Sequence, residues 1–360
     1  MIRVGIIGCG KIADQHAGQL SFIKNCKLVS VCDTDEIMAK QLYERFGAEK
    51  YYTNVYEFLD SSNLDVVHIT TPPQSHYDLG KIGLNYGCNI YLEKPFTVNS
   101  TEAGDLINLA KSKNLKMTVG HNGQYSHASI LMRKLVENGF LGGNPNHMEC
   151  YFGYSLGDPS YAKALLSDRE HWVRKLPGKL LHNIISHGIS KIAEYFPSDD
   201  PLVISHGFSS PILREIGESD IIDELRVIIS DKKSTTAYFT FSTQMRPILH
   251  QFRLYGPNNS LIIDEDHQTV IRLSGDSYKS YLNQFLPPLI YSKQYFNNSV
   301  SNVYKFLKRN FHSNIGMKFL IESFYKSIRN EGPLPFSYRE ILLTTKIMDE
   351  IFDQIFPDIE

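Results

Sequence analysis

The chain has 360 residues, 42% of them hydrophobic and 21% charged, and a formal net charge of −2 at pH 7. This length exceeds what one hydrophobic core usually serves, so we expect two domains in a soluble globular protein. The near-neutral charge argues against bulk attraction to nucleic acid, and no apolar run approaches the roughly 20 residues of a membrane span.

The five cysteines show neither a CxxC pair nor a spacing typical of zinc sites. We therefore expect free, mostly buried thiols, no metal site, and a reducing, cytoplasmic setting. The first residues, Met1–Ile7, lack the features of a secretory signal and read directly as a strand.

Strand-like runs and helix-like segments alternate up to about residue 121. We expect strands at Arg3–Gly8, Lys27–Asp33, Val66–Thr70, Asn89–Glu93 and Lys116–Gly120, and helices that begin near Ile12, Glu36, Ser75 and Thr101. Strands without polar alternation, separated by helices, predict a parallel sheet covered on both faces. Residues 1–121 are thus predicted to form a doubly wound nucleotide-binding domain of the α/β class.

The pattern changes in residues 122–360, which we expect to form a second, α+β domain. Helices are expected near Ile130–Asn138 and Asn183–Phe196, and a strand near Asn146–Tyr154. Further strand-like runs lie at Leu202–Ser209, Glu224–Ile229, Thr235–Ser242, Gln251–Tyr255, Ser260–Asp264 and Thr269–Leu273. Strands that follow one another through short turns predict a mostly antiparallel sheet.

The segment 277–321 is basic and aromatic. It contains no Asp or Glu, and its cations are Lys279, Lys293, Lys305, Lys308, Arg309 and Lys318. The favoured interpretation is a helical insertion that packs on its own domain or on another subunit; binding of a substrate phosphate and docking on an anionic membrane stay open. We expect Pro287-Pro288 to break any continuous helix there.

The turn after the first strand matches the motif G-x-G-x-x-A through Gly8, Gly10 and Ala13, with Lys11 and Ile12 between them. Gly8 permits the tight turn, Gly10 lets a pyrophosphate approach the backbone, and Ala13 lets the following helix pack closely. The amino terminus of that helix then offers N–H groups to phosphates. This pattern predicts a dinucleotide site.

Asp33 ends the second strand-like run, at about the distance from the glycines where a carboxylate binds the adenosine ribose. The following Thr34-Asp35-Glu36 offers no arginine for a 2′-phosphate, so NAD is favoured over NADP. The alternative is that Asp33 caps the next helix.

Two further strand ends carry candidate cofactor ligands. Thr71-Pro72 follows one strand, and His76 lies near the next helix start, where it contacts the cofactor, caps its helix or packs. Glu93-Lys94 follows the strand-like run Asn89–Leu92 and would place an ionisable lysine beside the cofactor. The alternative is an ordinary strand exit with a solvated lysine.

In this order, the motifs resemble those of the Gfo/Idh/MocA family, the relatives of glucose-fructose oxidoreductase and inositol dehydrogenase. The match comprises Gly8, Gly10, Ala13, Asp33, Thr71-Pro72, His76, Gly87, Glu93-Lys94-Pro95, Asn122 and His187. The resemblance covers nearly the whole chain. It implies an amino-terminal Rossmann domain and a second domain with a large open sheet that carries the substrate site and often builds oligomers, here a dimer or tetramer.

The resemblance also implies a catalytic pair. The family's lysine falls on Lys94 and its histidine on His187, but its aspartate falls on Asn183 and a common arginine on Gln124. We expect His187 to accept or donate the proton and Lys94 to orient the hydroxyl, or the reverse. Asn183 at i and His187 at i+4 would share one helix face.

Asn122, Trp172 and Arg174 are candidate substrate ligands, although the loop before His187 reads equally well as a packed loop with exposed cations. The resemblance implies an NAD-dependent oxidoreductase that acts on a secondary alcohol or ketone of a sugar, cyclitol or nucleotide-linked sugar. The alternative is a non-catalytic, cofactor-binding regulator or scaffold, which would not need Lys94 and His187 together.

Overall fold

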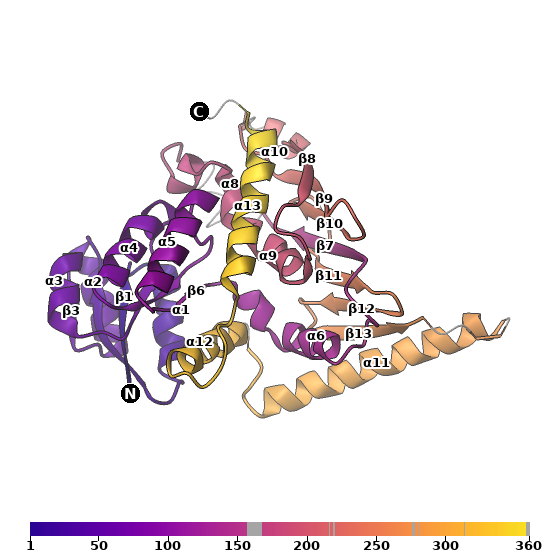
Figure 1. Cartoon of the computed structure of the whole chain (residues 1–360), viewed down its shortest axis with the longest axis horizontal. Helices are drawn as coiled ribbons and strands as arrows, with labels where there is room; N and C mark the ends of the chain where they lie inside the picture. Colours follow the sequence, from indigo (N-terminus) through magenta and orange to yellow (C-terminus); the bar gives the residue numbers. More distant parts are fainter. Residues whose placement is uncertain are drawn as a thin grey trace. The chain divides into compact units, whose positions relative to one another are not determined.

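The computed structural model describes residues 1–156, 168–215, 217–218, 220–275, 278–279, 281–312 and 314–357. The chain forms two compact units, which Figure 1 shows coloured along the sequence. Unit 1 comprises Met1–Asn122 and Gly316–Lys346, and unit 2 comprises Gly123–Ile315 and Ile347–Glu360. The first boundary lies next to the expected division at residue 121, but the segment 316–346, which we expected in the second domain, belongs to the first unit.

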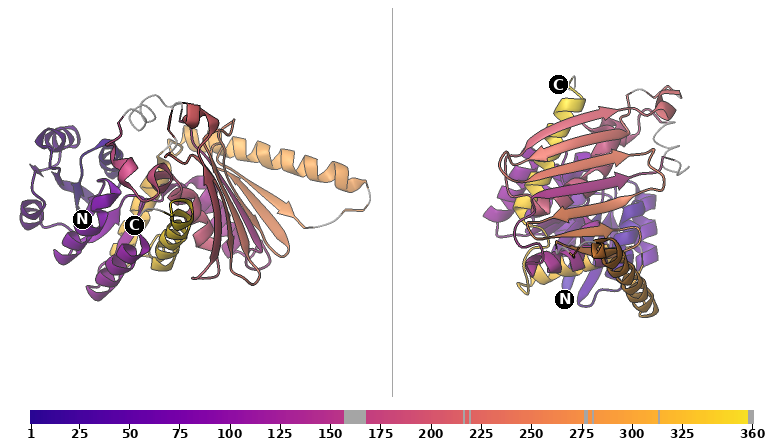
Figure 2. Two further views of the ribbon diagram at one scale, coloured as in Figure 1. Left: turned by 90° about the horizontal axis from the view of Figure 1, so that it is seen from above. Right: turned by 90° about the vertical axis from the view of Figure 1, so that its right-hand side faces the viewer.

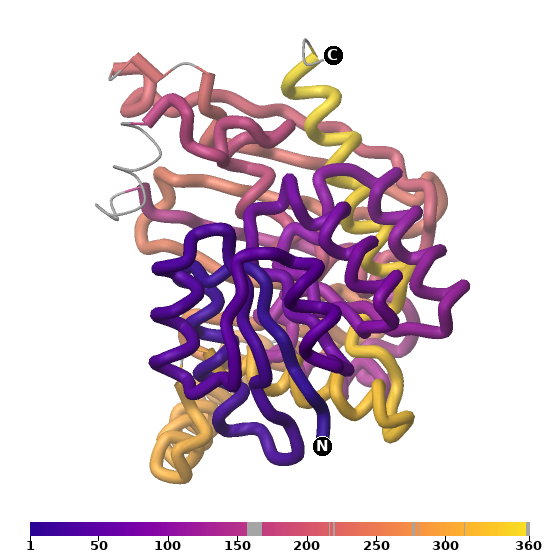
Figure 3. The backbone as a smooth tube through the Cα atoms, turned by 90° about the vertical axis from the view of Figure 1, so that its left-hand side faces the viewer, coloured from indigo at the N-terminus to yellow at the C-terminus, as the bar shows by residue number. Residues whose placement is uncertain are grey.

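Unit 1 contains a six-stranded parallel sheet in the order β3-β2-β1-β4-β5-β6. Its strands are β1 (Ile2–Ile7), β2 (Cys26–Cys32), β3 (Lys50–Tyr52), β4 (Val66–Ile69), β5 (Asn89–Leu92) and β6 (Met117–Val119). The helices between them are α1 (Lys11–Leu20), α2 (Glu36–Phe46), α3 (Val55–Ser62), α4 (His76–Asn85) and α5 (Ser100–Ser112). Figure 3 shows this alternation in indigo and purple. The predicted doubly wound α/β fold is confirmed.

β3 and α3 were not predicted, and neither were the two carboxyl-terminal helices, α12 (Ile315–Ile328) and α13 (Tyr338–Ile355). β3 is only three residues long, too short for a hydrophobic pattern. α3 does carry a start signal, because the Asn54 side chain accepts hydrogen bonds from the N–H groups of Tyr56 and Glu57.

Unit 2 contains a seven-stranded sheet in the order β13-β12-β11-β7-β10-β9-β8, in which only the β7–β10 pair is parallel. Its strands are β7 (His147–Gly153), β8 (Leu202–Phe208), β9 (Glu224–Ser230), β10 (Thr236–Ser242), β11 (His250–Tyr255), β12 (Asn259–Asp264) and β13 (Thr269–Ser274). The described helices include α6 (His127–Glu137), α8 (Lys179–Ile184), α9 (Ser186–Tyr195), α10 (Pro211–Glu215) and α11 (Leu282–Leu307). The mostly antiparallel sheet is confirmed.

One face of this sheet is covered and the other is open. α9 packs on the covered face through Gly188, where an added Cβ would collide with the Phe239 ring and lie 3.2 Å from the Cys150 Sγ. Along β9, buried Val227 alternates with exposed Ile228, as expected for a half-buried strand. The right-hand view of Figure 2 looks onto the open face.

α11 corrects the expectation that Pro287-Pro288 interrupts the segment 277–321. The helix runs without a break from Leu282 to Leu307 and includes both prolines. Both lie in the second turn, so they remove backbone donors only near the start of the helix. The remaining turns are anchored along β13 by side-chain hydrogen bonds, which offset that loss.

All five cysteines are free thiols, and every one except Cys26 is buried. Burial raises the pKa of Cys9, Cys32 and Cys150 to about 12. Thiols with such pKa values stay protonated and unreactive at neutral pH, as expected for structural residues.

Candidate active site

Gly8 and Gly10 shape the turn between β1 and α1 in different ways. Gly8 has a φ of +89°, and an added Cβ would lie 2.6 Å from the Thr71 Cγ2. Gly10, by contrast, has no atom within 4 Å of an added Cβ, and it begins α1 without any side-chain cap. The turn therefore leaves open space in front of a helix amino terminus, which fits the pyrophosphate of a dinucleotide.

Asp33 is fastened to this turn. Its Oδ2 accepts a hydrogen bond from the Cys9 N–H at 2.6 Å, and its Oδ1 accepts one from the Asp35 N–H at 2.9 Å. Asp35, not Asp33, caps α2, because its side chain accepts from the N–H groups of Ile37 and Met38. The alternative interpretation of Asp33 as a helix cap is therefore wrong, and its carboxylate lies at the end of β2, where a ribose would bind.

His76 connects the other two strand-end loops. Its Nε2 lies 2.9 Å from the Thr71 carbonyl oxygen, and its Nδ1 lies 3.0 Å from that of Pro95. The ring has no accessible surface, and burial lowers its pKa although the surrounding carbonyls favour the protonated form. Of the three roles considered for His76, packing is the one that this enclosed ring shows, and its bonds to two loops make it a positioning residue.

Lys94 follows β5 and precedes a cis peptide bond to Pro95. Its main-chain N–H donates to the Glu93 Oε2 at 3.1 Å. Burial lowers the pKa of the Lys94 side chain, and the nearby Glu93 opposes that shift. Lys94 is thus not the solvated lysine of an ordinary strand exit. A lysine with a lowered pKa is better suited to exchange a proton near neutral pH.

Beneath Lys94 lies a buried hydrogen-bonded chain that sequence analysis missed. The Glu93 Oε1 lies 2.8 Å from the His16 Nε2, the His16 Nδ1 lies 2.8 Å from the His68 Nδ1, and the His68 Nε2 lies 2.8 Å from the Tyr325 hydroxyl. The His68 ring also stacks on Tyr91, with centroids 4.7 Å apart. Gly120 leaves room for Glu93, because an added Cβ would lie 2.8 Å from its Cδ.

The chemistry of these groups fixes the donor at one end of the chain. A carboxylate only accepts, so the His16 Nε2–H donates to Glu93. Of the two facing Nδ1 atoms of His16 and His68, one donates and the other accepts, and the His68 Nε2 pairs with the Tyr325 hydroxyl in the complementary sense. Burial holds the pKa of His68 well below its usual value, in agreement with a neutral ring. Each contact in the chain thus joins one donor to one acceptor.

In unit 2, Asn183 and His187 lie on consecutive short helices instead of one helix beginning at Asn183. α8 ends at Ile184 and α9 begins at Ser186, with Ile185 between them. Ile185 keeps helical angles, φ −68° and ψ −18°, so the spacing of one turn between the two side chains is retained. The His187 ring is half-buried and stacks on Phe152 of β7, with centroids 6.0 Å apart.

Two charged residues near His187 were not predicted. Lys191 lies one turn further along α9, is 4% exposed and forms an ion pair with Glu265. Its Nζ also lies 5.7 Å from the centre of the Phe152 ring, on which the His187 ring stacks. The i, i+4 spacing of His187 and Lys191 was the only signal of this arrangement in the sequence.

Gln124, where relatives commonly carry arginine, belongs to a local charged cluster in unit 2. Its Nε2 donates to the Glu194 Oε2 at 2.8 Å, and the Nε of Arg133 lies 2.6 Å from the other oxygen of Glu194. The carboxylate of Glu194 is therefore paired with the guanidinium of Arg133 on one oxygen and with the amide of Gln124 on the other.

The remaining candidate ligands have different surroundings. The side chain of Arg174 is 7% exposed and forms an ion pair with Glu218 through two contacts, with N–O distances of 2.9 and 3.1 Å. Its guanidinium is therefore already engaged inside the protein. Trp172 is half-buried and stacks on His171, and Asn122 begins the 3₁₀ turn Asn122–Tyr125 at the boundary of the units.

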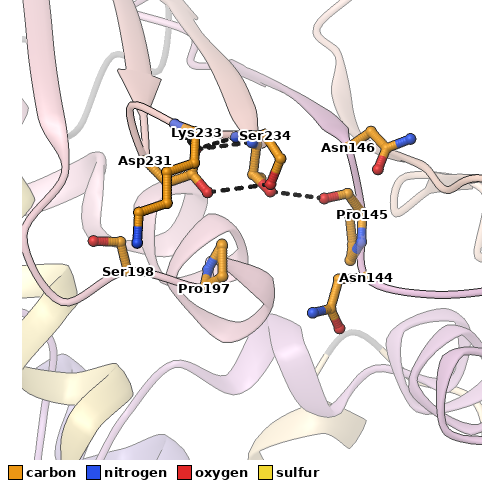
Figure 4. Close-up of a pocket in the computed structure, with 9 residues that line it drawn as sticks. Asn144, Pro145, Asn146, Pro197, Ser198, Asp231, Lys233 and Ser234 are labelled. Atoms are coloured by element: carbon orange, nitrogen blue, oxygen red, sulfur yellow. Dashed lines mark hydrogen bonds between the residues drawn. The ribbon is translucent and has the colours of Figure 1, made fainter.

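A surface pocket of about 370 Å³ lies elsewhere in unit 2 (Figure 4). Its lining residues lie just before β7 and β10 and, in the case of Pro197 and Ser198, after α9. Phe152, on which His187 stacks, lies near the other end of β7, about 20 Å away at 3.3 Å per residue. The carboxylate of Asp231 in this pocket stabilises a turn, because its Oδ1 accepts hydrogen bonds from the N–H groups of Lys233, Ser234 and Thr235. None of the predicted site residues lines this pocket.

Residues 2–121 match the family described as "Oxidoreductase family, NAD-binding Rossmann fold", Gfo/Idh/MocA. This amino-terminal part of the chain therefore belongs to the Gfo/Idh/MocA family. The chain is 30% identical over 200 residues to an oxidoreductase of Formosa agariphila, which covers 54% of this chain and 60% of that protein. It is 22% identical over 291 residues to the myo-inositol 2-dehydrogenase of Thermotoga maritima, or 79% of this chain and 83% of that one.

Among solved structures, UDP-N-acetylglucosamine 3-dehydrogenase from Acidithiobacillus ferrooxidans superposes with a TM-score of 0.72. The superposition covers 98% of this chain and 97% of that chain at 18% identity. At this identity the likeness concerns the fold. The chain covers less than two thirds of the Formosa protein, and the match to the family's Rossmann domain covers the amino-terminal third of this chain.

Proposed function

We propose that this protein is an NAD-dependent oxidoreductase that moves a hydride between nicotinamide and a secondary alcohol or ketone of a sugar-like substrate. The observation that carries the proposal is the position of Lys94 in unit 1. Thr71 packs against Gly8, and His76 joins Thr71 to Pro95. The ionisable lysine and the glycine turn thus lie at the same carboxyl edge of the sheet, the edge where such folds bind dinucleotides.

When bound, NAD supplies the hydride acceptor. The residues of the protein then have to handle the hydroxyl proton, since oxidation of an alcohol removes a hydride from carbon and a proton from oxygen. We assign His187 to accept this proton and Lys94 to orient the hydroxyl. Burial lowers the pKa of Lys94, so this lysine could also take up the proton if the two roles are exchanged. Phe152 fixes the plane of the His187 ring by stacking.

NAD rather than NADP is supported by the negative charge at the end of β2. Asp33 is held there by two backbone N–H groups, and Asp35 and Glu36 follow it. We expect Asp33→Ser to raise the KM for NAD by about tenfold and to narrow the preference over NADP, because a ribose hydrogen bond and a repelling charge are lost together. An unchanged cofactor preference would contradict this role.

For the substrate, we propose a sugar, cyclitol or nucleotide-linked sugar. The relatives named above act, by their names, on myo-inositol and UDP-N-acetylglucosamine. Asn183 and Trp172 are our proposed hydroxyl and ring contacts, with Asn122 at the unit boundary as a further polar group. Arg174 is omitted because Glu218 already engages it.

The test measures nicotinamide absorbance with a panel of sugars, cyclitols and nucleotide sugars. With the substrate found, Lys94→Ala and His187→Ala are each expected to lower kcat by about 10²- to 10⁴-fold. Lys113→Ala and His312→Ala, which change exposed residues of the same types, serve as controls. Full activity in both site variants would contradict the assignment, and dinucleotide binding without turnover of any compound would favour the regulator.

We further propose a homo-oligomer that assembles through the open face of the unit 2 sheet, in a reducing cytoplasmic compartment. The face exposes apolar side chains that include Ile204, Phe208, Ile228 and Tyr238. The five free cysteines support the compartment. Light scattering on the wild type and on Ile228→Glu tests the assembly, and an unchanged mass would exclude this face.

A further inference from the structure

α11 is attached to unit 2 by an array of amide side chains. Gln294 donates to and accepts from the backbone of Arg272, and Asn298 does the same with the backbone of Val270. The distances lie between 2.8 and 3.2 Å. Asn302 continues the row by donating to the His267 carbonyl at 3.0 Å. The amides bind the backbone N–H and C=O groups that a neighbouring strand would otherwise bind, and they thereby cover the edge of β13.

The opposite side of α11 is apolar and exposed. At 100° per residue, Leu289, Phe296 and Val303 lie on the side away from the amide row. They are 66%, 68% and 57% exposed. The stripe is completed by further exposed residues, Leu282, Phe285, Val300 and Leu307. Figure 1 shows α11 beside β13, and Figure 2 shows much of its length standing clear of the sheet.

The charge of the helix and its flanks has one sign. Lys279, Lys293, Lys308 and Arg309 are exposed, and the sequence has no Asp or Glu from Ser277 to Ile321. The chain as a whole has a net charge of −2, so this positive charge is a local feature. An exposed apolar stripe with flanking cations is the pattern of helices that lie in the surface of an anionic membrane.

We propose that α11 docks unit 2 on an anionic lipid surface, with the stripe of Leu289, Phe296 and Val303 entering the boundary between headgroups and acyl chains. The 26 residues of α11 span about 39 Å, so a long apolar stripe can contact the membrane surface when the helix lies parallel to it. The flanking cations would contact lipid phosphates. This mode of binding is peripheral: among the described helices, none combines the length and the apolar character needed to cross a bilayer.

Charge favours lipid over a pair of α11 helices from two copies of this chain. Two copies of α11 placed side by side would bring like charges together, and the segment Ser277–Ile321 offers no acidic residue to pair with them. Anionic lipid supplies the missing negative charge, at a contribution that grows with each Lys or Arg near the surface.

The experiment is co-sedimentation of the full chain with phosphatidylcholine vesicles, with and without phosphatidylglycerol. We expect binding to the anionic vesicles, weakened by added salt, and a loss of at least about tenfold in affinity in Phe296→Glu, with Leu289→Glu as a second variant. Phe22→Glu is the matched control, because Phe22 in unit 1 is 69% exposed and undergoes the same change of charge. It should bind like the wild type.

Three results would overturn the proposal. One is no binding to either kind of vesicle, and another is equal binding by Phe296→Glu and the wild type. The third is a change of molecular mass in solution caused by Phe296→Glu, which would show that a second copy covers the stripe. Circular dichroism establishes that each variant is folded. Lys293→Glu combined with Lys308→Glu should weaken binding to anionic vesicles while leaving the apolar stripe intact.

Discussion

Two regions of this molecule reverse the usual distribution of polar and apolar groups. Inside unit 1, Glu93, His16, His68 and Tyr325 are connected by hydrogen bonds and shielded from solvent. On the surface of unit 2, α11 exposes a row of apolar side chains. Burying a polar group costs little when it has a hydrogen-bond partner. Exposing single apolar side chains is common on protein surfaces and lowers the stability of the folded monomer only slightly.

The two regions should respond differently to a single substitution. Each member of the buried chain in unit 1 depends on the next, so a single substitution should propagate to Glu93, the residue beside Lys94. Each side chain of the α11 stripe faces solvent separately, so a substitution there should leave the fold intact and alter only what the helix binds. The predictions below test this difference.

Among substitutions in the buried hydrogen-bonded chain and on α11, the largest effect on stability is expected from Glu93→Leu. The substitution leaves the buried Nε2–H of His16 without its acceptor, at a cost of about 3 kcal/mol in the free energy of unfolding. Urea denaturation measures this cost. Glu93→Gln, which keeps an acceptor oxygen, should lose less, and Glu49→Leu, which removes an exposed ion pair with Lys27, should change little. Wild-type stability in Glu93→Leu would show that the chain is not coupled.

The next effect is a pH dependence of stability. The folded-state pKa values of His68 and His76 lie below the ordinary value of 6.5, mainly through burial. Below pH 6.5 the unfolded chain binds more protons at these two histidines than the folded chain does. Their contribution to the free energy of unfolding is therefore complete above this pH and is lost as the pH decreases. Each histidine contributes up to about 1.4 kcal/mol per pH unit.

The charged and titratable groups around His68 are His16 and, beyond it, Glu93, with Tyr325 on the other side. His68→Phe should flatten the decline measured by urea denaturation between about pH 5 and 6.5. His267 provides a control of opposite sign: Asp264 raises its pKa, so its small contribution is present at low pH and is lost as the pH rises. An unchanged slope in His68→Phe would contradict a neutral, buried ring.

A smaller effect is expected from Asn298→Ala in α11. The variant loses two hydrogen bonds to the backbone of Val270, which we expect to lower stability by about 1 kcal/mol and to speed amide hydrogen exchange at Val270. Asn297→Ala is the matched control, because this neighbouring asparagine is exposed and outside the amide row. Equal exchange in the two variants would show that the amides do not hold α11 on β13.

The sequence was most informative where one residue type satisfies a local backbone requirement. Gly8 was predicted from the motif, and its positive φ and its contact with Thr71 explain why glycine is needed there. Asp33 was placed correctly at the end of β2. Both predictions concern residues whose partners follow from the order of parallel strands, which the alternation of strands and helices makes readable.

Long-range contacts were beyond the reach of the sequence patterns. Tyr325 joins His68 across 257 residues, and no periodicity links a carboxyl-terminal helix to the third expected strand. Two predictions about helices were wrong for a related reason, because tertiary packing overrode local propensity. We expected one helix through Ile185, where two short helices meet, and a break at Pro287, where α11 is continuous. Arg174 looked like a ligand only because its partner, Glu218, lies 44 residues away.

The smallest change in stability is expected from Phe296→Ala on the exposed stripe of α11. The ring is 68% exposed, so its removal opens no cavity and should leave the free energy of unfolding within error of the wild type. Phe324→Ala, which truncates a fully buried ring packed against Tyr91 in unit 1, should cost about 3–5 kcal/mol in the same urea titration. A measurable loss in Phe296→Ala would mean that the stripe is already covered in the free protein, by another copy or by its own chain, and it would then be unavailable to a membrane.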